Sequence, residues 1–194
     1  MKTAFYMLAA AAAVAVTTAP AAAATMFSTM LSGANETAPN NSAATGSGTL
    51  LLSTNQNSID VFLSWNGLTG PATGGHVHCC AFQGADVSVA IDFGPSAVAT
   101  GSLTRSYDLT VAGTFTNGFI NANGGTVASA RTAFVNGLNI GRAYYNVHTA
   151  IFARGEIRGQ LAAVPETATW GMMIAGFGMV GGAMRMRRRT VALA

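Results

Sequence analysis

Apolar and polar residues alternate most clearly between positions 59 and 65, where Ile59, Val61, Leu63 and Trp65 are separated by polar positions such as Asp60. Residues two apart in an extended strand share a face, so this pattern predicts a β-strand with one buried side. Further short strands between turn-forming residues are predicted at 26–31, 49–53, 87–91, 107–111, 143–149 and 156–161, and around the histidine pair at 76–78.

One segment, 126–138, breaks this alternation. Its apolar residues Val127, Ala130, Phe134 and Leu138 recur every three or four positions, which predicts one face of a helix. Seven or eight short strands with one short inserted helix are typical of a mainly β protein. We therefore expect an antiparallel β-sandwich of the immunoglobulin-like (Ig-like) type.

The chain of 194 residues suggests one domain, with length to spare for targeting segments. A basic start, Met1-Lys2-Thr3, precedes an apolar stretch at 4–16, and Ala22-Ala23-Ala24 forms an A-x-A site before Thr25. This arrangement predicts a signal peptide at 1–24 that signal peptidase removes. The folded domain is then expected at 25–163.

The C-terminal segment, 164–189, begins with Pro165, Glu166 and Trp170 and continues as a glycine-rich apolar stretch at 171–184. It ends in an arginine cluster formed by Arg185, Arg187, Arg188 and Arg189. We expect a single hydrophobic helix there, a marginal transmembrane span with its arginines on the cytoplasmic side.

Motif, helix and arginine cluster together resemble the PEP-CTERM sorting signal of bacteria, although Thr167 stands where the motif has its second proline. The resemblance implies transient anchoring in the inner membrane and cleavage by an exosortase-type membrane protease. It also implies release to the cell envelope or the exterior, where extracellular polysaccharide or envelope proteins are the expected partners. A permanent single-span anchor is the alternative.

Charge is distributed unevenly along the chain. The segment 25–163 holds five arginines and six acidic residues, for a net charge of −1, so the overall excess of +3 comes from the two ends. A body without a basic patch cannot neutralise a phosphate backbone, which argues against nucleic-acid binding.

All three histidines of the protein lie in two short segments. His76 and His78 share one face of their predicted strand, and His148 shares a face with Asn146 in another. Imidazole suits zinc and copper, so these histidines are candidate metal ligands, with Glu156 as a candidate fourth.

The alternative is a purely structural polar cluster. Glu156 and Arg158 share the parity of a third strand, and together with Asn146 and the histidines they could satisfy one another's hydrogen bonds. In that case no metal is needed.

The two cysteines, Cys79 and Cys80, directly follow the histidine pair. Export favours a disulfide, although neighbouring Cα atoms about 3.8 Å apart are closer than the usual disulfide range. A vicinal disulfide, two free thiols and thiolate metal ligands all stay open. No nucleophile elbow, phosphate-binding loop or paired carboxylates are present, so no catalytic residue is predicted.

Several motifs together resemble the CHRD domain, a module of chordin and of many bacterial secreted proteins. They are Leu31–Glu36, Gly75-His76-Val77-His78, Tyr145–Thr149 and Gly155–Gln160, and the resemblance runs from Phe27 to Leu161. It brings no settled enzymatic activity, so the favoured function is an exported, non-enzymatic binding or structural module.

The alternative function is a copper- or zinc-binding protein or oxidoreductase that uses His76, His78 and His148. A histidine pair on a sandwich strand is similar to copper/zinc superoxide dismutase, so the sandwich could also be superoxide-dismutase-like. Three histidines provide fewer ligands than that enzyme needs, and dismutase chemistry is not expected.

Overall fold

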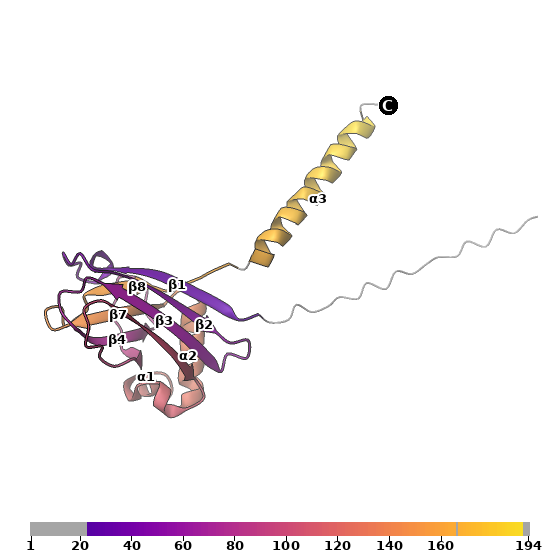
Figure 1. Ribbon diagram of the computed structural model, residues 1–194. Helices are drawn as coiled ribbons and strands as arrows, with labels where there is room; N and C mark the ends of the chain where they lie inside the picture. The colour runs from indigo at the N-terminus through magenta and orange to yellow at the C-terminus, as the bar shows by residue number, and fades with distance from the viewer. Residues whose placement is uncertain (1–22, 166, 192–194) are drawn as a thin grey trace, which may run out of the picture.

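The computed structural model describes residues 23–165 and 167–191. Most of the predicted signal peptide, together with Glu166 of the sorting motif, lies outside these residues. Figure 1 shows the strands gathered into one body, followed by the C-terminal helix.

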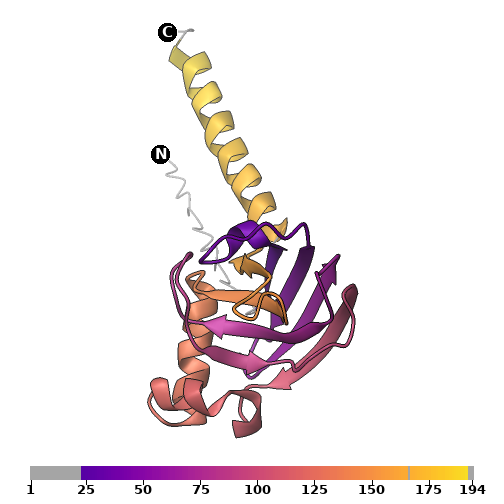
Figure 2. The same ribbon diagram turned by 90° about the vertical axis from the view of Figure 1, so that its left-hand side faces the viewer.

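The described part of the chain forms one antiparallel sheet of nine strands in the order β5-β4-β7-β8-β1-β2-β3-β6, with β9 also paired to β1. The strands are β1 (Thr25–Ser32), β2 (Thr45–Leu52), β3 (Ser58–Asn66), β4 (Ala72–Cys79), β5 (Val89–Asp92), β6 (Gly101–Asp108), β7 (Ala143–Thr149), β8 (Ile157–Gln160) and β9 (Ala162–Ala163). Figure 2 shows how this sheet curls into a half-barrel.

The half-barrel corrects the expected sandwich of two separate sheets. Strand β1 pairs with β2 on one side and with β8 and β9 on the other, so hydrogen bonding continues where a sandwich would have a gap. The two arms of the curled sheet still face each other, because the Tyr145 hydroxyl of β7 donates to the Thr49 carbonyl of β2 at 2.9 Å. Alternation alone could not distinguish the two architectures, since both bury every second residue.

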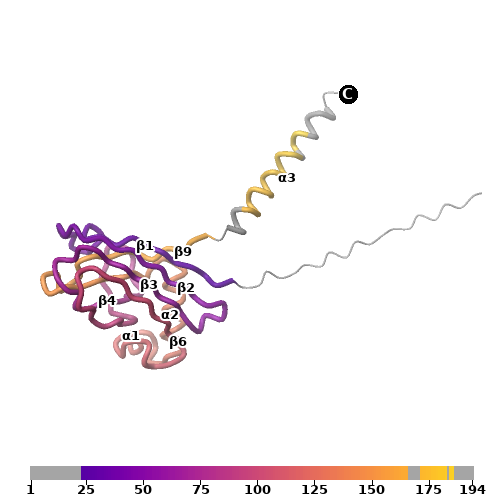
Figure 3. The backbone as a smooth tube through the Cα atoms, viewed as in Figure 1, coloured from indigo at the N-terminus to yellow at the C-terminus, as the bar shows by residue number. Residues whose placement is uncertain are grey.

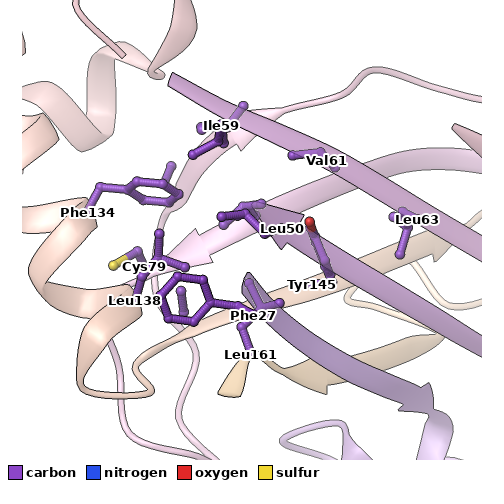
Figure 4. Packing of buried hydrophobic residues seen from close by; sticks show 14 of the residues in the cluster. Phe27, Leu50, Ile59, Val61, Leu63, Cys79, Phe134, Leu138, Tyr145 and Leu161 are labelled. Carbon is purple, nitrogen blue, oxygen red and sulfur yellow. The ribbon is translucent and has the colours of Figure 1, made fainter. Parts of the chain in front are cut away.

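The core lies inside this curl (Figure 4). Ile59, Val61, Leu63 and Trp65 of β3 are all buried, which confirms the alternation expected there. Tyr145 points into the same core from the opposite arm. The inner face of these strands is therefore occupied mainly by packed apolar side chains.

Two α-helices close one end of the half-barrel, and only the second was predicted. Helix α2 (Val127–Asn139) begins with a capping box formed by Thr126 and Ser129, and it buries Phe134 and Leu138 in the core. Helix α1 (Asn117–Ala122) was missed because six residues are too few to show helical periodicity. Two 3-10 turns are also present, η1 (Gly33–Asn35) and η2 (Ala112–Thr114).

The backbone trace in Figure 3 continues from β9 to helix α3 (Thr167–Val191), where the sequence predicts a helix. Within the described part of the chain, no helix combines the length and apolar character of a membrane span, so the expected transmembrane span is unsupported.

Candidate metal centre

The three histidines lie together on the outer face of the sheet. β4 and β7 are paired in a register that places Gly74 opposite His148 and His76 opposite Asn146. The intervening Val77 and Val147 are buried in the core. Strand alternation therefore turns the histidines away from the core, and sheet pairing brings together residues far apart in the sequence.

The imidazole rings lie close to one another. The ring centroids of His76 and His148 are 4.8 Å apart, those of His76 and His78 are 5.5 Å apart, and those of His78 and His148 are 6.2 Å apart. One ring nitrogen from each histidine lies within 4.8 Å of the other two.

Backbone carbonyls orient two of these rings. Nδ1 of His78 lies 2.7 Å from the Val87 carbonyl oxygen, and Nδ1 of His148 lies 3.1 Å from the Ala153 carbonyl oxygen. A carbonyl only accepts hydrogen bonds, so each neutral ring carries its proton on Nδ1 and a lone pair on Nε2.

The carboxylate of Asp92 orients the third ring, that of His76. A carboxylate oxygen of Asp92 lies 3.4 Å from Nε2 of His76, which favours a proton on Nε2 and a lone pair on Nδ1. Asp92 was not among the predicted site residues. The antiparallel pairing of β5 with β4, which sets Asp92 opposite His76, is the signal that could have found it.

Within the described part of the chain, the remaining nitrogen of each ring has no hydrogen-bond partner. Nδ1 of His76 and Nε2 of both His78 and His148 are buried without a hydrogen bond. Burial lowers the pKa of all three histidines, to about 4 for His78. The rings are therefore neutral at pH 7, which is the form that binds a metal.

This donor set fits zinc or copper. Tetrahedral zinc with Zn–N bonds of about 2.0–2.1 Å places its nitrogens about 3.3 Å apart. The ring nitrogens lie within 4.8 Å of one another, so the rings would have to move closer together to bind one ion. In metal sites, the histidine nitrogen that does not bind the metal usually donates a hydrogen bond to a carboxylate or a backbone carbonyl, as each of these rings is placed to do.

Glu156, the predicted fourth ligand, is not in this group. Its carboxylate accepts hydrogen bonds from the Ser42 hydroxyl, from the backbone and hydroxyl of Thr69, and from the Thr149 hydroxyl, at 2.6–2.9 Å. Burial opposes ionisation, but these donors hold the pKa of Glu156 below its usual value. The ionised carboxylate of Glu156 therefore has its hydrogen-bond donors already, and it lies on the side of the sheet to which the Thr149 side chain points.

The predicted polar cluster of Glu156, Arg158 and Asn146 is divided in the structure. Asn146 donates from Nδ2 to Glu36 at 3.3 Å, and Arg158 donates to other partners on the outer face. Neither is among the hydrogen-bond partners of Glu156. Glu36 was not among the predicted site residues, and only its burial beside Asn146 indicates a role for it.

Cys79 and Cys80 are joined in a vicinal disulfide at the end of β4. A Cβ added to Gly137 of α2 would overlap both sulfurs, so the disulfide sits directly against that helix. Since both sulfurs are bonded to each other, they are not thiolate ligands here.

The sorting-motif residues are distributed between the linker and α3. Pro165 ends the first described segment, and Trp170, Arg185, Arg187, Arg188 and Arg189 lie on α3. Arg185 is exposed. The role of the sorting-motif residues in sorting stays a prediction.

The comparisons with known proteins bear on the folded domain. The CHRD domain family model matches residues 27–161, which include all three histidines and both cysteines. No curated protein and no solved structure gives a significant match. Because the matched span covers more than half of the chain, the protein belongs to the CHRD domain family.

Proposed function

We propose that the protein is an exported CHRD module that binds copper or zinc through His76, His78 and His148. The observation that carries this proposal is the set of three buried ring nitrogens, one from each histidine, that have no hydrogen-bond partner among residues 23–165 and 167–191. Buried polar atoms are rarely left unsatisfied, and a bound cation would satisfy all three at once.

The role we favour is binding rather than catalysis. Three neutral imidazoles hold a metal firmly enough for storage, transfer or structural bridging, and the CHRD match covers the site without bringing an enzymatic activity. Copper in this site would add redox chemistry, so an oxidoreductase is the second candidate.

Export and sorting are part of the same proposal. The basic and apolar start of the chain supports cleavage by signal peptidase, and the segment 164–189 supports processing by an exosortase-type protease. The domain would then act in the cell envelope or outside the cell, near extracellular polysaccharide and envelope proteins.

The test is a titration of the purified full-length protein with Zn²⁺ and with Cu²⁺, followed by measurement of bound metal after dialysis. We expect about one equivalent for the wild type and for Asp60→Asn, which changes an exposed carboxylate elsewhere. His78→Ala should lose this binding. Equal metal content in all three proteins, or none in the folded wild type, would leave the histidines as structural residues.

A further inference from the structure

We infer that Arg158 is a positioning residue for the histidine site, which it controls through Tyr144 and through the backbone at Val87. This inference rests on the proposed metal-binding function. Arg158 is only 1 % exposed although it carries a permanent charge. A buried guanidinium is costly, and its contacts show what it holds in place.

The first contact is a stack of three side chains. The guanidinium carbon of Arg158 lies 3.5 Å from the centroid of the Tyr144 ring. The His78 ring is parallel to that of Tyr144, with the centroids 4.7 Å apart and 2° between the planes. β8 and β4 flank β7 on opposite sides, so Arg158 and His78 cover opposite faces of Tyr144.

The second contact is a clamp on the segment before β5. Arg158 donates from Nη2 to the Ala85 carbonyl at 2.8 Å and from Nη1 to the Asp86 carboxylate at 3.1 Å. The hydroxyl of Thr37 accepts from Nη1 at 2.7 Å and donates to the same carboxylate at 2.6 Å. The backbone is thus fixed immediately before Val87.

Both contacts reach His78. The Val87 carbonyl accepts from Nδ1 of His78, and the Val87 amide donates to the Tyr144 hydroxyl at 3.3 Å. Arg158 therefore supports the ring of His78 from its face and from its Nδ1 side. Together these contacts keep the proton on Nδ1 and leave Nε2 free as the unpartnered nitrogen.

A matched pair of variants tests this inference in the full-length protein. Arg158→Lys keeps the charge, but an ammonium group cannot stack flat on Tyr144 and donate to all three partners. Arg154→Lys is the control, because Arg154 pairs with the same Asp86 at 3.6 Å while its side chain is 91 % exposed. Zinc affinity, measured by competition with a chromophoric chelator, should fall about 10- to 100-fold for Arg158→Lys. We expect a change within about twofold for Arg154→Lys, as for an exposed ion pair.

The second readout is the tautomer of His78, measured by ¹⁵N NMR in the metal-free protein. We expect the Nδ1–H form in the wild type and a mixture of tautomers in Arg158→Lys, with His148 unchanged in both. Unchanged zinc affinity and an unchanged His78 tautomer in folded Arg158→Lys would overturn the inference. If the wild type binds no zinc, the proposed function fails, whereas the tautomer still decides whether Arg158 orients His78.

If Arg158→Lys does not fold, Asp86→Ala releases the clamp at a half-exposed side chain. It should weaken zinc binding in the same direction and perturb the same tautomer, while Arg154→Lys again serves as the control. A folded Asp86→Ala protein with wild-type affinity and tautomer would contradict the clamp.

Discussion

Glu36 and Asn146 are buried side by side, with Nδ2 of Asn146 3.3 Å from Oε2 of Glu36, while Oε1 of Glu36 and Oδ1 of Asn146 have no hydrogen-bond partner among the described residues. Burial raises the pKa of Glu36 to about 7, against the opposing effects of Arg158 and of the Asn146 hydrogen bond. A proton on Glu36 supplies the donor that this pair of free oxygens lacks. The fold therefore favours the neutral carboxyl.

Replacement of Glu36 by glutamine should remove a pH dependence of stability. In the folded protein the pKa of Glu36 is raised from 4.5 to about 7. The stabilisation that its neutral carboxyl group provides is therefore fully present below pH 4.5 and is lost as the pH rises through 7. Glu36→Gln should therefore be more stable than the wild type at about pH 8, by roughly 1–3 kcal/mol, and similar at about pH 4. Chemical denaturation at both pH values measures this, and an equal difference at both would contradict it.

His78 should produce the opposite dependence. Burial lowers its pKa from 6.5 to about 4, so the stability that its neutral ring contributes is present above 6.5 and is lost as the pH falls through 4. His78→Phe keeps a flat ring against Tyr144 but does not titrate. The advantage of the wild type over this variant should shrink by roughly 2–3 kcal/mol between about pH 7.5 and about pH 4. A difference that does not vary with pH would show that His78 is not buried as a neutral ring.

Glu156 should matter for stability and not for metal binding. Glu156→Gln places an amide donor among hydroxyl and N–H donors, which should cost about 2–4 kcal/mol in the free energy of unfolding. Asp60→Asn, at an exposed carboxylate that accepts from Ser106 at 2.6 Å, should cost less than about 0.5 kcal/mol. Zinc affinity should be unchanged in both. A large loss of zinc affinity in folded Glu156→Gln would restore Glu156 as a ligand.

Two glycines on helices should respond oppositely to alanine. A Cβ at Gly137 would overlap both sulfurs of the disulfide, so Gly137→Ala should destabilise the protein by about 1–3 kcal/mol. A Cβ at Gly118 of α1 meets nothing within 4 Å, and Gly118→Ala should stabilise the protein by about 0.4–1 kcal/mol. Thermal unfolding of the two variants decides this, and equal shifts would mean that the disulfide does not rest on Gly137.

Export can be tested by mass spectrometry of the protein recovered from cells. We expect an N-terminus at Thr25 and, where an exosortase is present, loss of the segment that follows Pro165. An uncleaved chain that starts at Met1 would contradict export. A chain that starts at Thr25 and retains its C-terminal arginines would support a permanent anchor.

The sequence predicted most of the strands but not their assembly, and the strand expected at 107–111 was misplaced, because β6 spans Gly101–Asp108. Alternation around Ile59–Trp65 and the helical spacing of Phe134 and Leu138 reflect local burial, which periodicity reports directly. The continuity of β8, β1 and β2 in one sheet depends on pairings between distant segments. Periodicity carries no information about such pairings, so a sandwich was expected where the sheet is one half-barrel.

In the candidate site too, local features could be predicted from the sequence, and contacts between distant segments could not. Strand parity correctly placed His76 and His78 on one face, because parity is a local property. It failed for Glu156, which precedes β8 and faces Thr149 instead of the histidines. Asp92 and the carbonyls of Val87 and Ala153 come from neighbouring segments whose positions only the fold determines.

The most direct test of the metal site is anomalous diffraction at the zinc edge from crystals of the zinc-loaded protein. We expect one anomalous peak at about 2.0–2.1 Å from each of three nitrogens, Nδ1 of His76 and Nε2 of His78 and His148. A zinc peak elsewhere on the protein, with the three rings left as they are in the metal-free fold, would contradict it.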